Sequence, residues 1–373
     1  MNLKHIYRLG IKELIALRRD PIMIVLILFM FTFQVYIAGT AASNMLRNTP
    51  IAIVDEDRSV LSGRIVDSFY PPEFLPPEIV SMDEIDPGLD SGRYTFTLHI
   101  PAHFQRDVLA GLSPVVQLNV DATRMSQAFS GSGQIQQMVL GEVNAFVQRH
   151  RKVVELPVEL TLRAKFNPTL EREWFGPIME IISGVTTLSI VLVGAALIRE
   201  REHGTIEHLL VMPVSPLEIM ISKVWSMGLV VLIASLFSLQ VVVEQVLSVP
   251  VQGSLALFIL TVSLHLFAST SMGIFMATLT RSMPQFAMLF LLTLLPMQIL
   301  SGGMTPRESM PDLAQQVMLL APTTHFTAAS QAILYRGAGL EVIAPHLLAL
   351  VVIGAALFLF SLGRFRKMLT AAG

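Results

Sequence analysis

The sequence contains no cysteine and few charged residues. The lack of cysteine excludes disulfide bonds, thiolate catalysis, iron-sulfur ligation and zinc sites with cysteine ligands. Only 14% of the 373 residues are charged, whereas 53% are hydrophobic, a balance outside the range of soluble domains. The formal net charge of -2 also lacks the basic surplus that nucleic-acid binding normally requires. We therefore expect an integral membrane protein that does not bind nucleic acid.

The sequence also lacks the motifs of a nucleotide site and of a metal site. No Gly-x-x-x-x-Gly-Lys-Ser/Thr loop occurs in the chain, so any energy from ATP has to come from another polypeptide. His203 and His208 lie in one polar segment but lack further ligands at a suitable spacing. We expect no catalytic residue, no cofactor bound by this chain and no metal.

Long apolar segments are abundant. About 20 apolar residues cross a hydrocarbon core of roughly 30 Å as a helix. The fold class predicted on this basis is an α-helical polytopic membrane protein with six transmembrane helices. The fifth segment is short and contains Pro296, which favours a kink or a re-entrant piece. The six spans are residues 21–43, 175–198, 224–246, 255–279, 285–300 and 343–363.

The positions of lysine and arginine predict the orientation. Basic residues gather in 1–20, 199–223 and 364–373 and at Arg281, whereas the short loop 247–254 has none. Short basic flanks favour the cytoplasmic side, so both termini are predicted to be cytoplasmic.

The first 20 residues are expected to form an amphipathic helix in the membrane interface, with Lys4, Arg8 and Lys12 near anionic headgroups. An ordinary basic flank that only orients the first span is the alternative. Small residues at 40–43 would also fit a signal peptide, but the preceding apolar run is too long for a signal core.

Residues 44–174 are long and polar enough to form an extracytoplasmic mixed α/β domain inserted between the first two spans. Strands are predicted at 51–55, 94–100, 115–120 and 158–166, and helices at 59–70, 101–110 and 126–149. The proline-rich stretch 71–77 is expected to be an extended surface connection, with a partner-binding loop as the alternative.

The polar loop 199–223 has a clear internal pattern. Gly204 interrupts the helix that leaves the second span, Thr205 is a suitable N-cap, and 206–212 predicts a short helix before Pro213. Ser215-Pro216-Leu217-Glu218 then forms a capping box for the next helix. Lys223 and Trp225 are expected at the inner membrane interface.

With these features, the chain resembles the permease subunit of ABC type-2 exporters that carry a large domain after the first span. The segment REREHGTIE at 199–207 is similar to the coupling-helix signature of that family. Further matches are IPAHF at 100–104 with Gly111 and DAT at 121–123, FNP at 166–168, SGGMTP at 301–306, SMP at 309–311, AP at 321–322 and RG at 336–337. One departure is Gln331, near a position where many relatives have arginine.

The resemblance implies a permease dimer, formed with a second copy or a paralogue in the bacterial inner membrane. Two cytoplasmic ATPase subunits that carry ATP and Mg would grip the coupling loops. The cargo class implied is a drug-like or amphipathic, lipid-like compound, and a periplasmic adaptor and an outer-membrane tunnel are compatible further partners. The candidate ATPase contacts are Glu200, Glu202, Gly204, Thr205 and Glu207. Alternatively, these Arg and Glu residues only solvate a helix end.

The region 301–342 is expected to contain half-helices that form an outer gate. The gate candidates are Gly302, Gly303, Pro306, Pro311 and Pro322.

Polar residues inside spans are functional candidates because burying them in lipid is costly. Glu180 and Glu244 could instead reach water or pair with an arginine, and His265 could hydrogen-bond between helices rather than serve as a proton relay. The candidates are Glu180, Glu244, His265 and Gln298, with Gln34 beside them.

A second class of function fits the same pattern. A membrane-anchored receptor or scaffold would use the external domain to bind a partner without moving a solute. Co-purification with an ATPase would separate the two classes.

Overall fold

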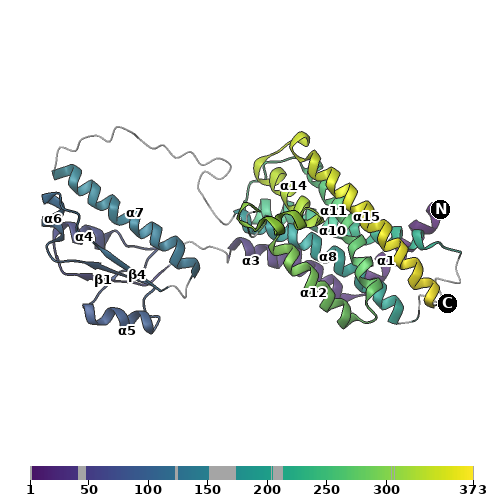
Figure 1. Ribbon diagram of the computed structural model, residues 1–373, viewed down its shortest axis with the longest axis horizontal. Coiled ribbons are helices and arrows are strands. Elements are labelled where there is room, and N and C mark those ends of the chain that lie inside the picture. Colours follow the sequence, from purple (N-terminus) through teal and green to yellow (C-terminus); the bar gives the residue numbers. More distant parts are fainter. Residues whose placement is uncertain are drawn as a thin grey trace. The chain divides into compact units, whose positions relative to one another are not determined.

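The computed structural model describes residues 2–40, 48–121, 125–150, 174–202, 204, 213–303, 305 and 307–372. The chain divides into two compact units, which Figure 1 shows as a helical bundle and a smaller α/β body. The helical unit comprises Met1–Ala42 and Ala164–Gly373, and the α/β unit comprises Ser43–Arg163.

The helical unit is built from long apolar helices joined by short connections. Two of them contain π-helical turns, η1 (Phe29–Phe33) between α2 and α3 and η4 (Ser238–Val246) after α10. A short 3-10 turn, η5 (Arg307–Ser309), precedes α13. The α-helices are α1 (Leu3–Arg18), α2 (Pro21–Leu28), α3 (Gln34–Thr40), α8 (Phe175–Glu202), α10 (Pro216–Phe237), α11 (Leu255–Leu279), α12 (Met283–Ile299), α13 (Asp312–Met318), α14 (Pro322–Arg336) and α15 (Leu340–Ala372).

Five helical segments in the described part of the chain are long and apolar enough to cross a membrane. Each of the six predicted spans falls on a helix, but the fifth coincides with α12, which has 17 residues and contains Pro296. The third begins at Pro216 rather than at 224, because Ser215 caps the helix there. The five long segments are Pro21–Thr40, Phe175–Glu202, Pro216–Val246, Leu255–Leu279 and Leu340–Met368.

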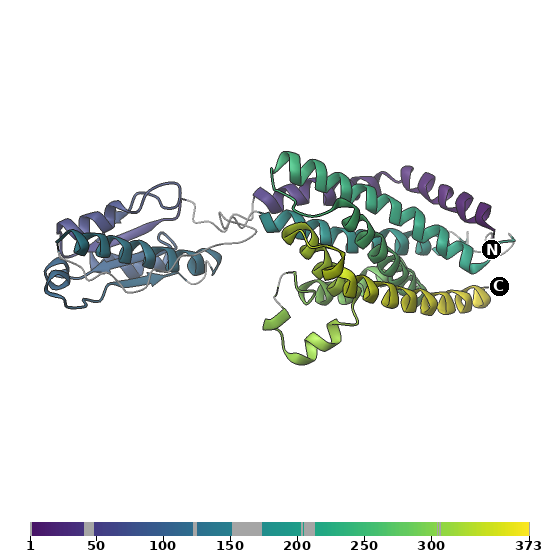
Figure 2. The same ribbon diagram turned by 90° about the horizontal axis from the view of Figure 1, so that it is seen from above.

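The centre of the bundle is α8, which is buried along most of its length and packs against α11 (Figures 1 and 2). Small residues let these two backbones approach closely. The Oγ atoms of Ser189 and Ser269 are 2.7 Å apart, and a Cβ added at Gly273 would lie 2.8 Å from the carbonyl oxygen of Ile190. A larger residue at position 273 would therefore push α11 away from α8.

The helices at the periphery expose large apolar side chains, as expected for surfaces that face lipid or another subunit. On α12 these are Met288, Leu291, Leu292 and Leu295, and on α15 they include Leu348, Val352 and Leu359.

The segment after α12, where the sequence predicts half-helices, contains two helices with different surroundings. Most side chains of α14 are buried, including Phe326, Ala329 and Ile333, and the helix packs against α15, α11 and α8. The short α13 instead exposes Leu313 and Val317. Figure 2 shows the light-green segment around α13 standing out from the bundle. Because nearly the whole of α14 is buried, its sequence does not separate an apolar face from a polar one.

The α/β unit contains a four-stranded sheet with strand order β2-β1-β3-β4. The strands are β1 (Ile51–Asp55), β2 (Glu78–Ile79), β3 (Phe96–Ile100) and β4 (Gln117–Val120). β1 pairs in parallel with β2 and β3, and β3 pairs antiparallel with β4. The sequence did not predict β2, which has only two residues. The strand predicted at 158–166 lies outside the described residues.

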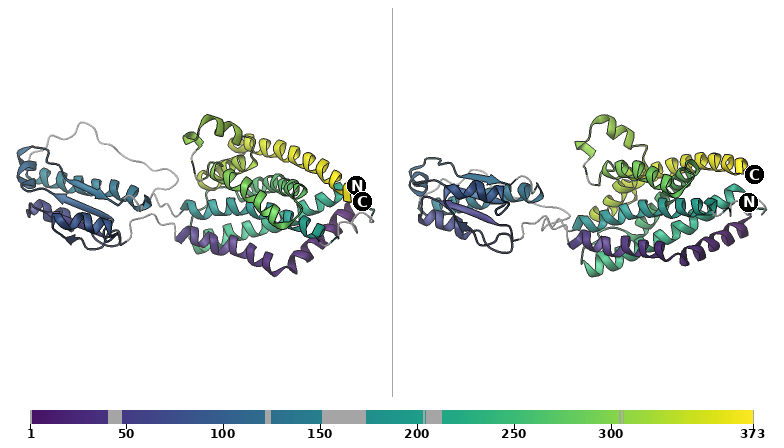
Figure 3. Two further views of the ribbon diagram at one scale, coloured as in Figure 1. Left: turned by 60° about the horizontal axis from the view of Figure 1, so that its bottom comes forward. Right: turned by 90° about the horizontal axis from the view of Figure 1, so that it is seen from below.

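Helices cover both faces of this sheet. α4 (Val60–Asp67), α6 (Phe104–Ala110) and α7 (Met125–His150) lie on one face, and α5 (Ile85–Asp90) on the other, after the 3-10 turn η2 (Met82–Glu84) (Figures 1 and 3). The core between the sheet and the first face contains Ile53, Leu98 and Ile135. The unit therefore has a hydrophobic core of its own.

The proline-rich stretch 71–77 is not only a surface connection, as the sequence suggested. Phe74 is fully buried, with its ring centroid 5.1 Å from that of Phe69 and 6.5 Å from that of Phe96. Prolines prevent regular helix on both sides of Phe74, but they do not prevent its side chain from entering the core.

We predict that Phe74→Ala destabilises the α/β unit by about 3–5 kcal/mol, because it removes a fully buried ring from a packed core. Hydrogen exchange measured on the full chain should show faster exchange of the β1 and β3 amides, with the bundle amides unchanged. Tyr70→Ala is the matched control because Tyr70 is exposed. Equal protection of β1 and β3 in both variants would show that Phe74 does not hold this core.

Candidate functional site

A cluster of four charged residues, of which only Lys12 is exposed, lies where α1, α8 and α10 meet. Nζ of Lys223 is 3.0 Å from Oε1 of Glu13 and 2.8 Å from Oε2 of Glu200. Glu200 also accepts a hydrogen bond of 2.8 Å from Nζ of Lys12. We name Lys12, Glu13, Glu200 and Lys223 the lysine-glutamate cluster, in which two cations balance two anions.

Burial makes this cluster a strong geometric constraint. The Lys223 side chain is only 2% exposed, and those of Glu13 and Glu200 are 7% and 11% exposed. A buried charge is tolerated only when opposite charges and hydrogen bonds replace its hydration. Each partner comes from a different helix, so the three helices have to remain together for Lys223 to stay charged inside the protein.

The N-terminus of α1 is attached to the start of α10 by a second set of contacts. Glu218 accepts hydrogen bonds from the backbone N–H groups of Asn2 and Ser215, while Ser215 Oγ accepts one from the Glu218 N–H. The capping box predicted from the sequence is thus confirmed. Glu218 therefore stabilises the start of α10 and holds α1 against it.

Trp225 extends the contact between α1 and α10. Its ring stacks parallel to that of Tyr7, and its Nε1 donates to the Ile6 carbonyl at 3.3 Å. The ring lies directly on Gly10, where any Cβ would overlap it. Only glycine at position 10 allows this approach.

The C-terminal turn of α8 is bonded to two further parts of the bundle. Nη1 of Arg201 donates to the Thr280 carbonyl at 2.7 Å, beside the end of α11. Oε1 of Glu202 accepts from the Met283 N–H at 3.1 Å, at the first turn of α12. The residues that precede the polar loop are therefore fixed to the helices around them.

Arg199 makes an ion pair with Asp20, which also caps α2 by accepting from the Met23 N–H at 3.2 Å. Burial, the largest single influence, raises the pKa of Asp20. The hydrogen bonds from the Met23 and Ile22 backbone and from Arg199, with the charge of Arg199, together hold the pKa of this carboxyl below its ordinary value. Asp20 is thus kept as an anion that joins α2 to α8.

A cavity of about 320 Å³ lies beside the lysine-glutamate cluster. Its walls combine charged and apolar side chains. They are Lys12, Glu13, Ala16, Leu17, Met23, Leu192, Ala196, Arg199, Glu200 and Met227.

Several residues in and next to the polar loop make contacts that the sequence did not indicate. Glu200 is mostly buried in the cluster, whereas Glu202 is exposed and accepts a hydrogen bond from the first turn of α12. Lys223 is paired with Glu13 and Glu200 inside the protein. Trp225 packs on α1.

The remaining loop candidates are only partly described. Gly204 has φ +67°, a left-handed conformation that ends the helix as predicted. Thr205, Glu207 and the predicted helix at 206–212 lie outside the described residues.

The predicted N-terminal helix is present as α1, and α10 covers one of its faces. It packs along α10 through Ile6, Gly10 and Glu13, whereas Leu3 and Tyr7 are exposed. Nζ of Lys12 donates to Glu200. The buried face of α1 therefore contains an ion pair as well as apolar contacts.

Three of the intramembrane polar candidates, His265, Gln298 and Glu180, form hydrogen bonds between helices. Nε2 of His265 is 2.8 Å from Thr186 Oγ1, and the imidazole stacks on Phe326, so His265 joins α11 to α8. Nε2 of Gln298 donates to Thr187 Oγ1 at 2.9 Å, which joins α12 to α8.

The two glutamates behave differently from each other. Glu180 accepts from Gln34, so its partner is an amide rather than an arginine. Glu244 is exposed in η4. Glu180 therefore joins α8 to α3.

The predicted gate residues have mainly local structural roles. Gly302 has φ +92°, and a Cβ on Gly303 would overlap the methyl of Met179 on α8. Pro311 precedes α13 and Pro322 is the first residue of α14. Pro306 lies outside the described residues.

Sequence reasoning missed Glu13 and Asp20. Glu13 is the first acidic residue of the chain and follows Ile6 and Gly10 at helical spacing. A lone carboxylate on a buried face requires a cationic partner, so this pattern could have indicated an ion pair. It could not have identified Lys223, because that contact spans 210 residues of sequence.

The chain is similar to known membrane proteins over nearly its whole length. Residues 21–362 match the family described as ABC-2 family transporter protein. The inner membrane transport permease YhhJ of Escherichia coli K12 is 58% identical over 366 residues, covering 98% of both chains. The probable multidrug ABC transporter permeases YbhR and YbhS of the same strain are 27% and 25% identical, covering 95% and 90% of this chain and 96% and 90% of their own.

We predict that Lys223→Met destabilises the helical unit by about 3–5 kcal/mol, because Glu13 and Glu200 lose their shared buried cation. Thermal unfolding in detergent, followed by tryptophan fluorescence, would measure the effect. The exposed Lys4 on α1 gives the matched control Lys4→Met. Adding Glu13→Gln to Lys223→Met should restore part of the stability by removing one unpaired anion. Equal midpoints for Lys223→Met and Lys4→Met would contradict the role of the cluster.

Proposed function

The chain belongs to the ABC-2 family of transporter proteins, and from that premise we propose that it is the permease subunit of an ATP-driven exporter. The proposed cargo is a drug-like or amphipathic, lipid-like compound taken from the cytoplasm or the inner leaflet. The similarity to permeases named as multidrug transporters supports this cargo class. The chain is a transport permease rather than an enzyme.

The family works with a cytoplasmic ATPase partner, and the sequence agrees with ATP being bound by another subunit. No phosphate-binding loop occurs in the chain, so ATP and Mg are assigned to the ATPase subunits. The proposed contact is the polar loop between α8 and α10, with Thr205 and Glu207 as the leading candidates. Glu200 and Glu202 are assigned to holding the base of the loop.

The lysine-glutamate cluster gives the best support for the polar loop as the ATPase contact. The cluster lies where the loop joins α8 and α10, which is here called the base of the loop. Lys223 of α10 and Glu200 of α8 flank the loop in sequence and form an ion pair. A force applied to the loop would therefore act on α8, α10 and, through Glu13, α1 together. ATP binding would supply the free energy that favours one arrangement of these helices over another.

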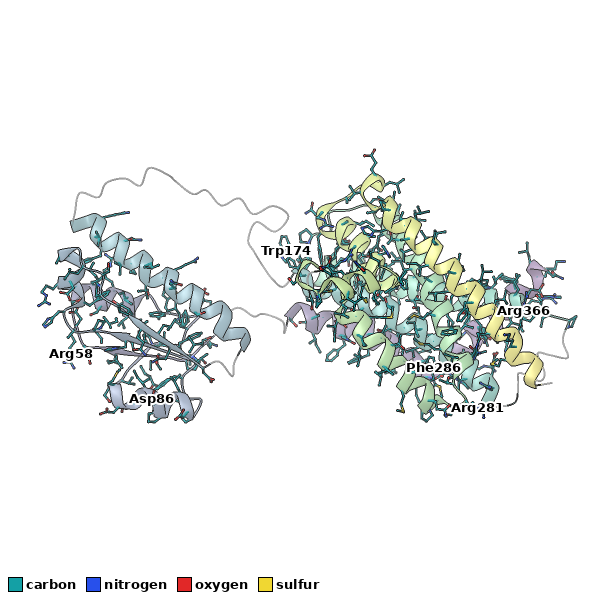
Figure 4. All side chains as sticks on the ribbon, viewed as in Figure 1. Arg58, Asp86, Trp174, Arg281, Phe286 and Arg366 are labelled. Carbon is teal, nitrogen blue, oxygen red and sulfur yellow. The ribbon has the colours of Figure 1, made fainter. Side chains whose placement is uncertain are left out.

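We propose a multi-pass protein of the bacterial inner membrane with both termini in the cytoplasm. The similarity to a named inner membrane permease and the basic flanks support this placement. In Figure 4 Arg281 and Arg366 lie at one end of the bundle and Trp174 at the other, and the first two belong to the proposed cytoplasmic end.

A dimer with a second permease would cover part of the exposed apolar surface. Met288 and Leu292 on α12 and Leu348 on α15 are among the most exposed apolar residues of the bundle. The gate is proposed to lie at the opposite end from the polar loop, around Gly302, Gly303 and Pro322. A periplasmic adaptor and an outer-membrane tunnel are proposed further partners.

A membrane-anchored receptor or scaffold is the second candidate function. The independent core of the α/β unit favours it, because such a unit can bind a partner without transport. In that case activity would not depend on an ATPase.

We predict that Glu207→Lys leaves the protein inserted but reduces ATP-dependent efflux at least tenfold, because a reversed charge repels a cationic contact on the ATPase. Efflux and ATP hydrolysis should be measured together in proteoliposomes that contain both subunits. Hydrolysis should continue while efflux falls.

Glu341→Lys is the matched control, because Glu341 is exposed at the start of α15, far along the chain from the loop. If ATP hydrolysis and efflux stay coupled in Glu207→Lys, the charged residues of the loop only solvate a helix end. Activity without any ATPase subunit would favour the receptor or scaffold.

A further inference from the structure

A second polar cavity lies beyond the lysine-glutamate cluster, at the same end of the bundle. It has a volume of about 420 Å³ and is formed by the end of α8, the end of α11 and the C-terminal part of α15. We name it the basic pocket. Its lining residues are Arg201, Thr278, Leu279, Arg281, Arg364, Lys367 and Met368.

Every ionisable side chain that lines the basic pocket is cationic. Within the described residues, no ion pair joins Arg201, Arg281 or Arg364 to a carboxylate. The neighbouring cluster is different, since each lysine there lies against a glutamate and Arg199 lies against Asp20. Cations gathered around one hollow repel each other, and an anion in the pocket would remove that repulsion.

The arginines of the pocket come from separate segments of the chain. Arg201 is oriented by its hydrogen bond to the Thr280 carbonyl, which also fixes the backbone next to Arg281. Arg364 lies on α15, which packs along α11. The fold therefore brings these groups together, and guanidinium groups in this arrangement suit the oxygens of a phosphate.

The surroundings of the pocket are apolar. Leu279 and Met368 belong to its wall, and Leu279 is exposed. α12 begins two residues after Arg281 and exposes Met288 and Leu292 along its length. A ligand with a phosphate head and acyl chains would match this combination of a basic hollow and an adjoining apolar helix face.

We propose that the basic pocket binds the phosphate headgroup of an anionic membrane lipid. Basic pockets between membrane helices on the cytoplasmic side suit such headgroups. Soluble phosphate shares the same chemistry, but it would make no use of the exposed apolar face of α12. The proposal depends on the proposed function only in its assignment of this end to the cytoplasmic side, and lipid binding can be measured without any ATPase.

The test uses the purified full chain in detergent, titrated with phosphatidylglycerol, cardiolipin or phosphatidylcholine while the thermal unfolding midpoint is recorded. The two anionic lipids should raise the midpoint in a saturable way, and phosphatidylcholine should not. In Arg281→Ala/Arg364→Ala the apparent Kd for the anionic lipids should rise about 30-fold, since two cationic contacts are lost.

Arg18→Ala/Arg366→Ala is the matched control, because it removes two exposed cations outside the pocket. Both double variants should unfold near the wild-type midpoint when no lipid is added. If the control weakens lipid binding equally, the effect belongs to overall surface charge and the proposal is overturned. An equal response to phosphatidylcholine would also overturn it.

Two further measurements separate other occupants from a lipid. Inorganic phosphate that produces the same stabilisation at the same concentration would identify a soluble phosphate site and overturn the lipid assignment. Unchanged lipid binding in Arg281→Ala/Arg364→Ala, together with lost binding of the ATPase subunit, would identify the surface as a protein contact. Failure of the exporter proposal alone would leave the lipid titration unaffected.

Discussion

The burial of Lys223 is the constraint on which the end of the bundle next to the polar loop depends. An ammonium group at 2% exposure is stable only with anionic partners, and Glu13 and Glu200 lie within 3.0 Å of it. These partners come from α1 and α8, while Lys223 itself is on α10. Apolar contacts could allow the three helices to shift along each other, but the ion pairs and the capping contact of Glu218 define their register.

This constraint gives the polar loop a defined base. The loop leaves α8 at Gly204, whose left-handed backbone ends the helix, and enters α10 at the Ser215 capping box. Glu200 lies four residues before Gly204 and Lys223 eight residues after Ser215, and the two are paired with each other. A partner that binds the loop would thus act on a unit of three helices rather than on one flexible connection.

The sequence predicted the features that arise from local rules. The capping box at Ser215, the break at Gly204 and strand β1 depend on residues a few positions apart, and the long apolar runs indicate where helices lie. It could not predict the partners of Lys223 or the burial of Phe74 and α14, because these depend on contacts between distant segments. The contacts of Trp225 with Tyr7 and Gly10 on α1 could not be predicted for the same reason.

The contacts of α8 change in strength along its length, and this difference bears on the proposed movement. In the middle, Ser189 with Ser269, Thr186 with His265 and Thr187 with Gln298 are neutral hydrogen bonds to α11 and α12. Interhelical bonds of this kind contribute on average about 0.6 kcal/mol in membranes. Breaking a buried ion pair costs about 3–5 kcal/mol, so the end that contains Lys223 should remain intact while the middle exchanges partners. In the proposed exporter, α1, α8 and α10 would therefore move together, and the rearrangement would occur where α11 and α12 contact α8.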